Sequence, residues 1–482
     1  MKLRSIALLA ISLSCAAGAN AQSTPPAEQT RVTPLAPVVV TATRVPGDPL
    51  LLPTAIDAIN ADEIRRAQPR LDVGEALQRV PGVVARDRQN QAQDLQLSIR
   101  GFGARAAFGV RGVRLYTDGI PATMPDGQGQ LSHFPLESAA RIEVLRGPFS
   151  VLYGNAAGGV VSLYTATAPT APVAVLGVTF GEDALRRESL SLQAPWREDG
   201  DALVDIVRIV GDGYRMHSAS QRRSGQMLLR GGWGRDGRFT ALFNHFDLVA
   251  DDPQGLSAAQ LAGDRRAASA GAITFDTRKT VRQDQAGFRM DHAISETTTL
   301  VATAWKGSRK TFQMLSVPVA VQRASARHSG GAIDLDRDYG GIDARIRWTG
   351  TFFDTPLAFT AGVDDEVAEE RRRGFENFVG NRLGVVGALR RDEENRVQSR
   401  DVYLQAEWTP APRWRIHAGL RHGEVRFVSR DHFVTSVNPD DSGSVAYASS
   451  SPAMGVLFRA TPWLSVYANQ GNGFETPTFS EL

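Results

Sequence analysis

The chain has 482 residues, of which 42% are hydrophobic and 22% are charged, so its composition excludes an intrinsically disordered polymer. Its formal net charge is +2, and two of the positive charges, Lys2 and Arg4, lie at the N-terminus. A nearly neutral chain gives no electrostatic basis for a nucleic-acid partner. The single cysteine, Cys15, also lies near the N-terminus, so no disulfide or thiolate metal site is expected after it.

Residues 1–21 have the pattern of a secretory signal peptide. Lys2 and Arg4 supply the basic region, residues 5–18 supply the apolar core, and Ala19-Asn20-Ala21 predicts cleavage after Ala21. Lipidation of Cys15 is an alternative, disfavoured because Ser12 stands where a lipoprotein signal has a large aliphatic residue. No later run of about 18 apolar residues occurs, which predicts either a soluble exported protein or a membrane β-barrel.

Residues 22–52 are predicted to be a flexible segment, since Pro, Thr and Gln are frequent up to Ala36. A β-branched run then follows, consisting of Val38, Val39, Val40, Thr41, Ala42 and Thr43. This run has two interpretations that the residues alone leave open. It is either an edge strand of the next domain or an exposed strand that a partner protein adds to its own sheet.

Residues 53–168 are predicted to form a small α+β domain. Residues 61–68 and 72–80 resemble two short helices that end at Pro69 and Pro81, and residues 83–86 resemble a strand. Between residues 97 and 159, three short apolar runs are separated by glycine-rich turns, which is typical of a compact β unit. The middle run ends in Asp118-Gly119, a pair that favours a tight turn.

Residues 169–482 show strands of about 9–12 residues in which apolar and polar side chains alternate. In residues 401–408, for example, Val402, Leu404 and Ala406 share one face, whereas Asp401 and Gln405 share the other. An apolar face of this kind meets a second sheet in a soluble sandwich, and lipid in an outer-membrane barrel.

Two further observations favour the barrel. The tryptophans all fall in this region, mostly at strand ends where an aromatic girdle belongs: Trp196, Trp233, Trp305, Trp348, Trp408, Trp414 and Trp463. Short turns at 409–413 and 459–462 alternate with long loops predicted at 250–282, 307–340, 364–397 and 428–442. The charged run 364–373 is accordingly interpreted as a solvated loop. We expect about 12–14 strands, the last of them at 463–469.

Several motifs resemble the plug signature of TonB-dependent outer-membrane receptors: Ile99-Arg100-Gly101, Asp118-Gly119, residues 142–148 (IEVLRGP) and residues 153–160 (YGNAAGGV). Near the C-terminus, Asn472-Gly473-Phe474, Thr476-Pro477 and Glu481-Leu482 are similar to a motif of that family's barrel. The resemblance covers essentially the whole chain after the signal peptide.

The resemblance implies a membrane β-barrel of 22 antiparallel strands that encloses an N-terminal plug domain. It implies that residues 38–43 are the TonB box, a strand that joins a sheet of the TonB energy transducer and is pulled to loosen the plug. Because only about 12–14 strands are expected here, the chain is predicted to lack the C-terminal part of the barrel.

The resemblance also suggests residue roles. Arg100 and Arg146 are matched to plug arginines that pair with barrel glutamates; Glu143 is the local alternative partner. Ligand contacts are expected from loops at the apex of the plug, with candidates Arg105, Arg111, Met124, Asp126 and Gln128. The two arginines suit an anionic iron chelate, although they suit loop capping equally well.

The expected function is therefore energised uptake of a ferric siderophore or similar metal chelate by a monomer in the Gram-negative outer membrane, with lipid, TonB and the chelate as partners. The alternatives are a passive porin or adhesin, an outer-membrane lipase, and an inactive truncated receptor. The sequence contains no GxSxG or HExxH motif and no phosphate loop, so no enzymatic activity is expected. The eight histidines are scattered, so neither a metal nor a cofactor is expected.

Overall fold

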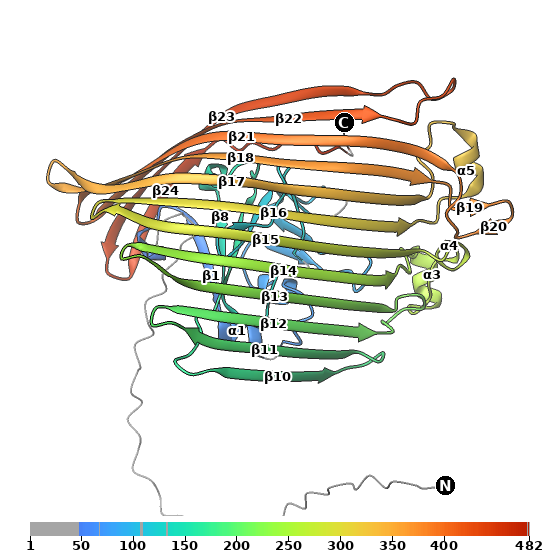
Figure 1. Ribbon diagram of the computed structural model, residues 1–482, viewed down its shortest axis with the longest axis horizontal. Coiled ribbons are helices and arrows are strands. Elements are labelled where there is room, and N and C mark those ends of the chain that lie inside the picture. Colours follow the sequence, from blue (N-terminus) through green and yellow to red (C-terminus); the bar gives the residue numbers. More distant parts are fainter. Residues whose placement is uncertain (1–47, 67, 107–108, 132–133, 480, 482) are drawn as a thin grey trace, which may run out of the picture. The chain divides into compact units, whose positions relative to one another are not determined.

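The computed structural model describes residues 48–482, apart from residues 67, 107–108, 132–133, 480 and 482. The predicted signal peptide and the predicted TonB box at residues 38–43 therefore lie outside the described residues. Two regions follow one another along the chain (Figure 1). Residues 49–165 form a small mixed region, called the plug below, and thirteen of the strands from Val173 onward form one large sheet.

The plug contains short helices and short strands. The helical elements are η1 (Pro49–Leu51), α1 (Ala61–Arg65), α2 (Gly74–Leu77) and η2 (Pro148–Tyr153). The strands are β1 (Ala55–Asn60), β2 (Val83–Arg86), β3 (Gln96–Ile99), β4 (Val110–Arg111), β5 (Val113–Thr117), β6 (Ile120–Pro121), β7 (Gln128–Gly129), β8 (Ala139–Arg146) and β9 (Gly159–Thr165). Five of them form a sheet in the order β1-β8-β9-β5-β6.

The predicted tight turn at Asp118-Gly119 is present and connects β5 to β6. Thr117 pairs with Ile120 across it, and both turn residues have positive φ, at 50° and 81°. These angles suit an Asp-Gly hairpin turn. Gly119 also approaches the large sheet closely, since a Cβ built there would lie 2.4 Å from Nη1 of Arg289.

The plug has its own apolar core. Leu97, Leu115, Ile142, Val144 and Leu163 are completely buried in it. The β-branched and aliphatic runs of β5, β8 and β9 have both faces covered, as a central strand requires. Helices α1 and α2 lie within the predicted ranges 61–68 and 72–80 but are shorter. Asn60, the residue before α1, caps this helix through a capping box with Glu63.

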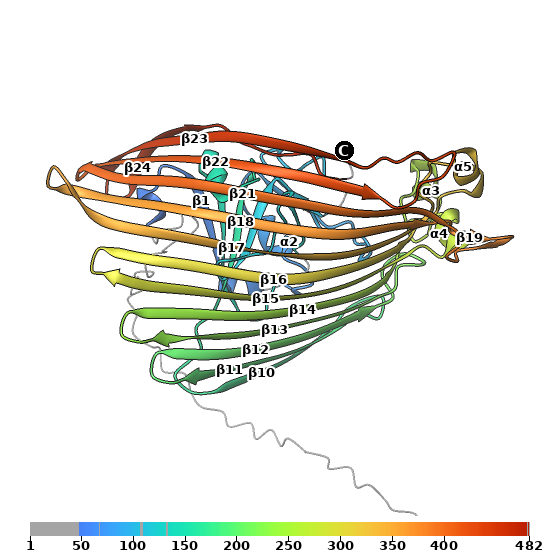
Figure 2. The ribbon, with the colours of Figure 1, turned by 45° about the horizontal axis from the view of Figure 1, so that its top comes forward.

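The large sheet contains thirteen antiparallel strands, in agreement with the expected 12–14. They are β10 (Val173–Phe180), β11 (Arg186–Trp196), β12 (Gly200–Gly211), β13 (Ser220–Trp233), β14 (Gly237–Asp251), β15 (Arg278–Ser295), β16 (Thr298–Met314), β17 (Ala332–Phe352), β18 (Thr355–Phe375), β21 (Leu389–Ala411), β22 (Trp414–Asp431), β23 (Gly443–Thr461) and β24 (Leu464–Gly471). Each strand pairs with the next in this order (Figure 2).

The connections alternate between short turns at one end of the sheet and long loops at the other. Turns such as 296–297, 353–354 and 412–413 are short, whereas 252–277, 315–331, 376–388 and 432–442 are long. The long loops carry α3 (Ala258–Gly263), α4 (Ala270–Phe275), α5 (Val319–Ala324) and the hairpin of β19 (Phe378–Val379) and β20 (Arg382–Leu383). In the described part of the chain, none of the helices has the length and hydropathy to span a bilayer.

The alternation predicted for residues 401–408 is confirmed by burial. Val402 and Leu404 are 54% and 49% exposed on the outer face of β21, whereas Asp401 and Gln405 are 7% and 4% exposed on the inner face. Nothing in the described part of the chain covers those apolar side chains as a second sheet of a sandwich would. An exposed apolar outer face opposite a polar inner face is the arrangement of a membrane β-sheet.

Two expectations were wrong in detail. The charged run 364–373 lies within β18, not in a loop, because its acidic residues alternate between faces: Glu366 and Glu370 are buried, and Glu369 is exposed. Trp305 is only 6% exposed on the inner face of β16, so it takes no part in an outer girdle, unlike Trp233 and Trp463, which are exposed.

The proposed domain boundary at residue 168 stays a prediction. β9 ends at Thr165 and β10 begins at Val173.

Candidate functional site

Ion pairs join the plug to the inner face of the sheet. Arg114 of β5 pairs with Glu366 of β18, and both side chains are almost completely buried. Glu137, which precedes β8, pairs with Arg187 of β11. Asp94 lies between two sheet cations, with Nζ of Lys279 at 2.6 Å and Nη2 of Arg309 at 3.8 Å. Buried charges require such partners, so these pairs fix where the plug sits against the sheet.

Sheet side chains also donate hydrogen bonds to carbonyl oxygens of the plug backbone. Arg421 Nη1 lies 2.9 Å from the carbonyl oxygen of Leu152, and Gln285 Nε2 lies 2.7 Å from that of Pro121. Arg230 and Arg222 make similar bonds, the first to the carbonyl oxygens of residues 165 and 166, the second to that of residue 71. These contacts satisfy backbone acceptors that the plug would otherwise bury unpaired.

Arg100 and Arg146, which the motifs match to plug–barrel ion pairs, are not among the residues of the contacts described above. Arg146 pairs with Asp57 and donates to the carbonyl oxygen of Pro81, both within the plug. The reason is register: β1 runs antiparallel to β8 with residue 55 opposite 146, which brings Asp57 within diagonal reach. Glu143 accepts from Arg141 Nε at 2.7 Å, and Arg100 is exposed at a turn with φ of 52°. A pairing of Arg100 or Arg146 with barrel glutamates stays a prediction.

A cavity of about 350 Å³ lies between the plug and the ends of β15–β18 that adjoin the long loops; we call it the long-loop cavity. Its lining contains six cationic side chains: Arg105 and Arg111 from the plug, and Lys279, Arg309, Arg337 and Arg372 from the sheet. Three acidic side chains line it as well: Asp94, Glu370 and Glu481. Its apolar wall is formed by Ala106, Ile333, Leu335 and Phe479.

Pairing within the long-loop cavity leaves an excess of positive charge. Arg337 Nε donates to Glu370 at 2.9 Å, and Arg111 Nε lies 3.1 Å from Glu475. Arg372 has no ion pair among the described residues. Burial alone would raise the pKa of the Asp94 carboxyl, but the nearby Lys279 and Arg309 hold that pKa below its usual value. Asp94 offsets part of the positive charge of Lys279 and Arg309, but the cations of the cavity still outnumber its acids, which favours an anionic ligand.

The five predicted ligand residues come together around this cavity. Arg105, Arg111 and Gln128 line it. Met124 and Asp126 do not line it but lie behind it: Arg337 Nη1 is 2.8 Å from Met124 Sδ, and Asp126 accepts from the Gln128 N–H at 3.1 Å. Burial raises the pKa of Asp126, although Arg337 acts against that shift. Ligand contact by these five residues stays a prediction.

The sheet contributes cations that sequence reasoning missed, namely Lys279, Arg309, Arg337 and Arg372. A signal for them existed in the alternation, because inward-facing lysines and arginines near the long-loop ends of strands are the ones that can face a ligand. Placing them required the exact strand ends, and part of the relevant segments had been interpreted as loops. These side chains are now the main source of positive charge in the cavity.

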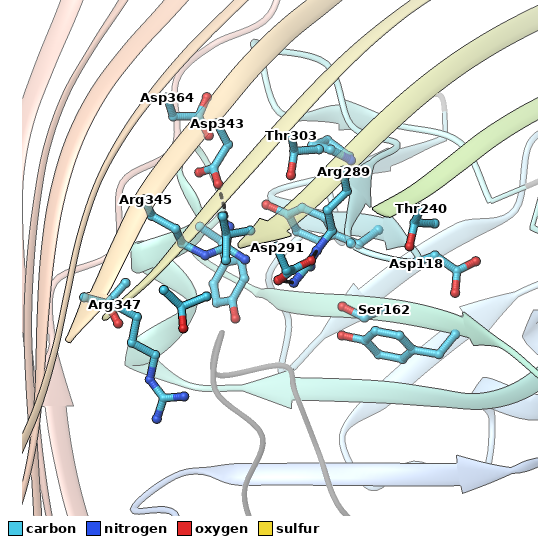
Figure 3. Close-up of a pocket in the computed structure, with 18 of the residues that line it drawn as sticks. Asp118, Ser162, Thr240, Arg289, Asp291, Thr303, Asp343, Arg345, Arg347 and Asp364 are labelled. Atoms are coloured by element: carbon cyan, nitrogen blue, oxygen red, sulfur yellow. Dashed lines mark hydrogen bonds and ion pairs between the residues drawn. The ribbon is translucent and has the colours of Figure 1, made fainter. Parts of the chain in front are cut away.

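A second cavity, of about 500 Å³, lies between the plug and the ends of the same strands that adjoin the short turns (Figure 3). We call it the short-turn cavity. Arginines and aspartates line it together with threonine and tyrosine hydroxyl groups, among them Arg289, Asp343, Arg347, Thr303 and Tyr164. Most of its lining residues are polar, but Pro121 and Val301 line it as well.

One group of metal-ligating side chains occurs among the described residues: ligand atoms of His217, Asp251 and Asp276 lie within 4.8 Å of one another. Two of them already have protein partners. His217 Nε2 lies 2.9 Å from the carbonyl oxygen of Thr277, and Asp276 pairs with Arg278 at 2.5 Å. We assign no metal to this group.

A plug held by buried ion pairs against a large antiparallel sheet with an apolar outer face defines an outer-membrane receptor of the plugged-barrel class. Two family models match this chain: TonB-dependent Receptor Plug Domain over residues 49–160, and TonB dependent receptor-like, beta-barrel over residues 214–482. The chain therefore belongs to the TonB-dependent receptors, a family of the Gram-negative outer membrane whose members are transporters and receptors rather than enzymes.

Among curated proteins, the vitamin B12 transporter BtuB of Photobacterium profundum is 22% identical over 473 residues, which cover 92% of this chain and 63% of the relative. BtuB of Vibrio vulnificus is 28% identical over 166 residues, 34% of this chain and 26% of the relative. This chain thus spans less than two thirds of either relative's length.

Among solved structures, the unliganded ferric citrate transporter FecA gives a TM-score of 0.76 at 21% identity, covering 90% of this chain and 65% of FecA. BauA, the ferric preacinetobactin receptor of Acinetobacter baumannii, gives 0.71 at 16% identity, covering 89% and 65%. At such identities the likeness establishes the fold alone.

Proposed function

We propose that this chain takes up a ferric siderophore or a similar anionic metal chelate across the outer membrane, as a monomer exported by a signal peptide cleaved after Ala21. The long-loop cavity carries the proposal, because six cations line a space between plug and sheet. They outnumber the three acids that line it together with Glu475, which pairs with Arg105 and Arg111. Guanidinium groups bind carboxylates and other planar oxyanions through paired hydrogen bonds. The apolar wall of the cavity accommodates the hydrocarbon part of such a chelate.

We further propose that residues 38–43 are the TonB box and that the TonB energy transducer is the partner that pulls on them. A β-branched strand of this length can join a partner's sheet through main-chain hydrogen bonds. The ion pairs of the plug with the sheet, such as Arg114 with Glu366, are the contacts that a pull would have to overcome.

Uptake of ⁵⁵Fe citrate by iron-starved cells that produce this chain tests the proposal. Wild-type cells are expected to accumulate iron only while the transmembrane potential is maintained, and deletion of residues 38–43 is expected to abolish accumulation. Deletion of residues 24–29, six residues from the preceding flexible segment, serves as the matched control. Uptake that persists after deletion of 38–43 would instead support a passive porin.

Vitamin B12 is the second candidate ligand, because the curated relatives are named as vitamin B12 transporters. Growth of a methionine auxotroph on limiting vitamin B12 separates the two candidates. The charge excess of the long-loop cavity leads us to expect that this chain supports growth of iron-starved cells on ferric chelates. If it instead supports only the growth of the auxotroph on vitamin B12, vitamin B12 is the ligand. Heat-modifiable mobility on a gel checks that the chain forms a folded barrel; its absence would favour an inactive receptor.

A further inference from the structure

The short-turn cavity lies on the same strands and the same face of the sheet as the long-loop cavity. Arg337 lines the long-loop cavity and Arg347 lines the short-turn cavity, and both belong to β17. The two positions are ten residues apart along the strand, and because side chains alternate between faces, both point inward. Ten residues correspond to about 33 Å along a strand. The two cavities therefore lie at opposite ends of one interface between plug and sheet.

Four of the five arginines that line the short-turn cavity are already paired. The pairs are Arg141 with Glu143 at 2.7 Å, Arg230 with Asp201 at 2.6 Å, Arg289 with Asp291 at 2.7 Å and Arg345 with Asp343 at 2.5 Å. Arg347 has neither an ion pair nor a hydrogen bond among the described residues, and its Nε is buried. Figure 3 draws its guanidinium group apart from the labelled aspartates.

The acids of the short-turn cavity do not neutralise Arg347. Asp291 and Asp343 are bound to their own arginines, and Asp364 lies 3.7 Å from Arg421. Asp118 accepts from the backbone N–H and the hydroxyl group of Thr165. Glu407, on β21, acts on Arg347 electrostatically but is not paired with it. The guanidinium group of Arg347 is therefore available to a ligand.

Hydroxyl groups extend this site along the wall. Thr299 of β16 and Thr360 of β18 are the direct cross-strand neighbours of Arg347, so the three side chains form a row on the inner face. Thr303 lies on the same face of β16, and its Oγ1 is buried without a hydrogen-bond partner among the described residues. A buried hydroxyl group without a partner has a free-energy cost that a polar ligand or water would remove.

We propose that the short-turn cavity is a second binding site, which holds a carboxylate group of the chelate after it has left the long-loop cavity. Arg347 binds the carboxylate through its guanidinium fork, and the threonine hydroxyl groups donate to the remaining oxygens. At about 500 Å³ the cavity is within the size range of sites for small organic ligands. This inference rests on the proposed function, because the ligand is the transported chelate.

Calorimetric titration of the purified full chain in detergent tests the inference, with ferric citrate and with citrate alone as probes. The wild type is expected to bind two equivalents of ferric citrate. Arg347→Gln is expected to weaken one of the two sites about tenfold or more, and Thr303→Val to weaken the same site about threefold. Arg347→Lys keeps the positive charge but not the two-pronged guanidinium group. Its affinity for ferric citrate at this site is expected to lie between those of the wild type and Arg347→Gln.

Two variants separate the sites. Arg238→Gln removes an exposed arginine near the same end of β14 that does not line the cavity, and should leave both sites unchanged. Arg372→Gln should weaken only the other site, in the long-loop cavity. Circular dichroism and heat-modifiable mobility confirm that each variant is folded. Citrate alone should bind at the Arg347 site if a free carboxylate suffices, and only ferric citrate should bind there if the intact chelate is required.

The outcomes distinguish this inference from the proposed function. A single ferric citrate site that responds to Arg372→Gln but not to Arg347→Gln would overturn the second site and leave the proposed function intact. Absence of all binding by both probes would overturn the second site and would exclude ferric citrate as the ligand of the proposed function. Citrate binding that Arg347→Gln removes, in a chain that binds no ferric citrate, would keep the anion site and reject the chelate as its ligand.

Discussion

Arg114 of the plug and Glu366 of the sheet form an ion pair whose side chains are 2% and 3% exposed, although 252 residues separate them in the sequence. Removing one partner of a buried pair leaves an uncompensated charge. Glu366→Gln is therefore expected to lower the free energy of unfolding by about 3 kcal/mol or more, measured by urea denaturation in detergent.

The neighbouring residue Glu369 provides the control for that prediction. Its ion pair with Arg396 lies on the outer face of β18, with both side chains more than half exposed. Exposed pairs contribute little, so Glu369→Gln should change the free energy of unfolding by less than about 1 kcal/mol. Equal effects of the two substitutions would contradict a special role for the buried pair.

The close approach of Gly119 to Arg289 predicts a second effect. Gly119 has a φ of 81°, and a Cβ there would lie 2.4 Å from the guanidinium group of Arg289. Gly119→Ala should therefore cost about 2 kcal/mol of stability, from backbone strain together with the shift that the Arg289 side chain must make. Gly234→Ala, at a turn with φ of 65° and no atom within 4 Å of the added Cβ, should cost only about 1 kcal/mol. Thermal unfolding of the two variants in the same detergent makes the comparison.

The position of Asp94 between Lys279 and Arg309 predicts a gain of ligand affinity. All three side chains line the long-loop cavity, so an anionic ligand competes with Asp94 for the two cations. Asp94→Asn should raise the affinity for ferric citrate about threefold to tenfold at low salt, with the difference shrinking as ionic strength rises. Asp87→Asn, an exposed acid of the same loop, is the control, and unchanged affinity in Asp94→Asn would exclude competition.

Asp72 predicts a pH dependence within the plug. Burial, reinforced by the nearby Asp87 carboxylate, raises the pKa of Asp72 from 3.8 to about 6. Because the folded state holds this proton more tightly than the unfolded state, its stabilising effect is complete below about pH 4 and is lost as the pH rises through about 6.

Hydrogen exchange of residues 69–81 measures this effect. Corrected for intrinsic exchange rates, protection should fall on the order of 1 kcal/mol between pH 4 and pH 7 in the wild type. Asp72→Asn keeps an oxygen that can accept from the Gly74 N–H and should remove the pH dependence. Asp62→Asn, whose side chain is 81% exposed, should not.

The sequence predicted the regular parts of this fold because local patterns determine them. Alternation along residues 401–408 identified a strand and its two faces, and Asp118-Gly119 identified a hairpin turn. The charged run 364–373 was interpreted as a loop because long charged segments are usually solvated, yet here alternate members are buried against the plug. Their partners are distant in the sequence: Glu366 pairs with Arg114 of the plug, and Glu370 pairs with Arg337 of β17.

The candidate site was predictable only in part, for a related reason. The glycine-rich apex of the plug pointed to Arg105, Arg111 and Gln128, which do line one cavity. Arg337 and Arg372 entered that cavity from strands more than 200 residues away, through a register that no local pattern encodes. Arg146 was assigned by motif, whereas its partner Asp57 depends on the pairing of β1 with β8.

The hydrogen bonds from sheet side chains to plug carbonyl oxygens have an evolutionary consequence. Arg421 and Gln285 recognise the backbone at residues 152 and 121, and a carbonyl oxygen is present whatever side chain the plug carries there. Substitutions on that surface of the plug can accumulate without loss of these contacts, provided the backbone keeps its path. At these two positions the sheet therefore constrains the path of the plug backbone rather than its side chains, and a chimera whose plug keeps the same backbone path should retain these two contacts.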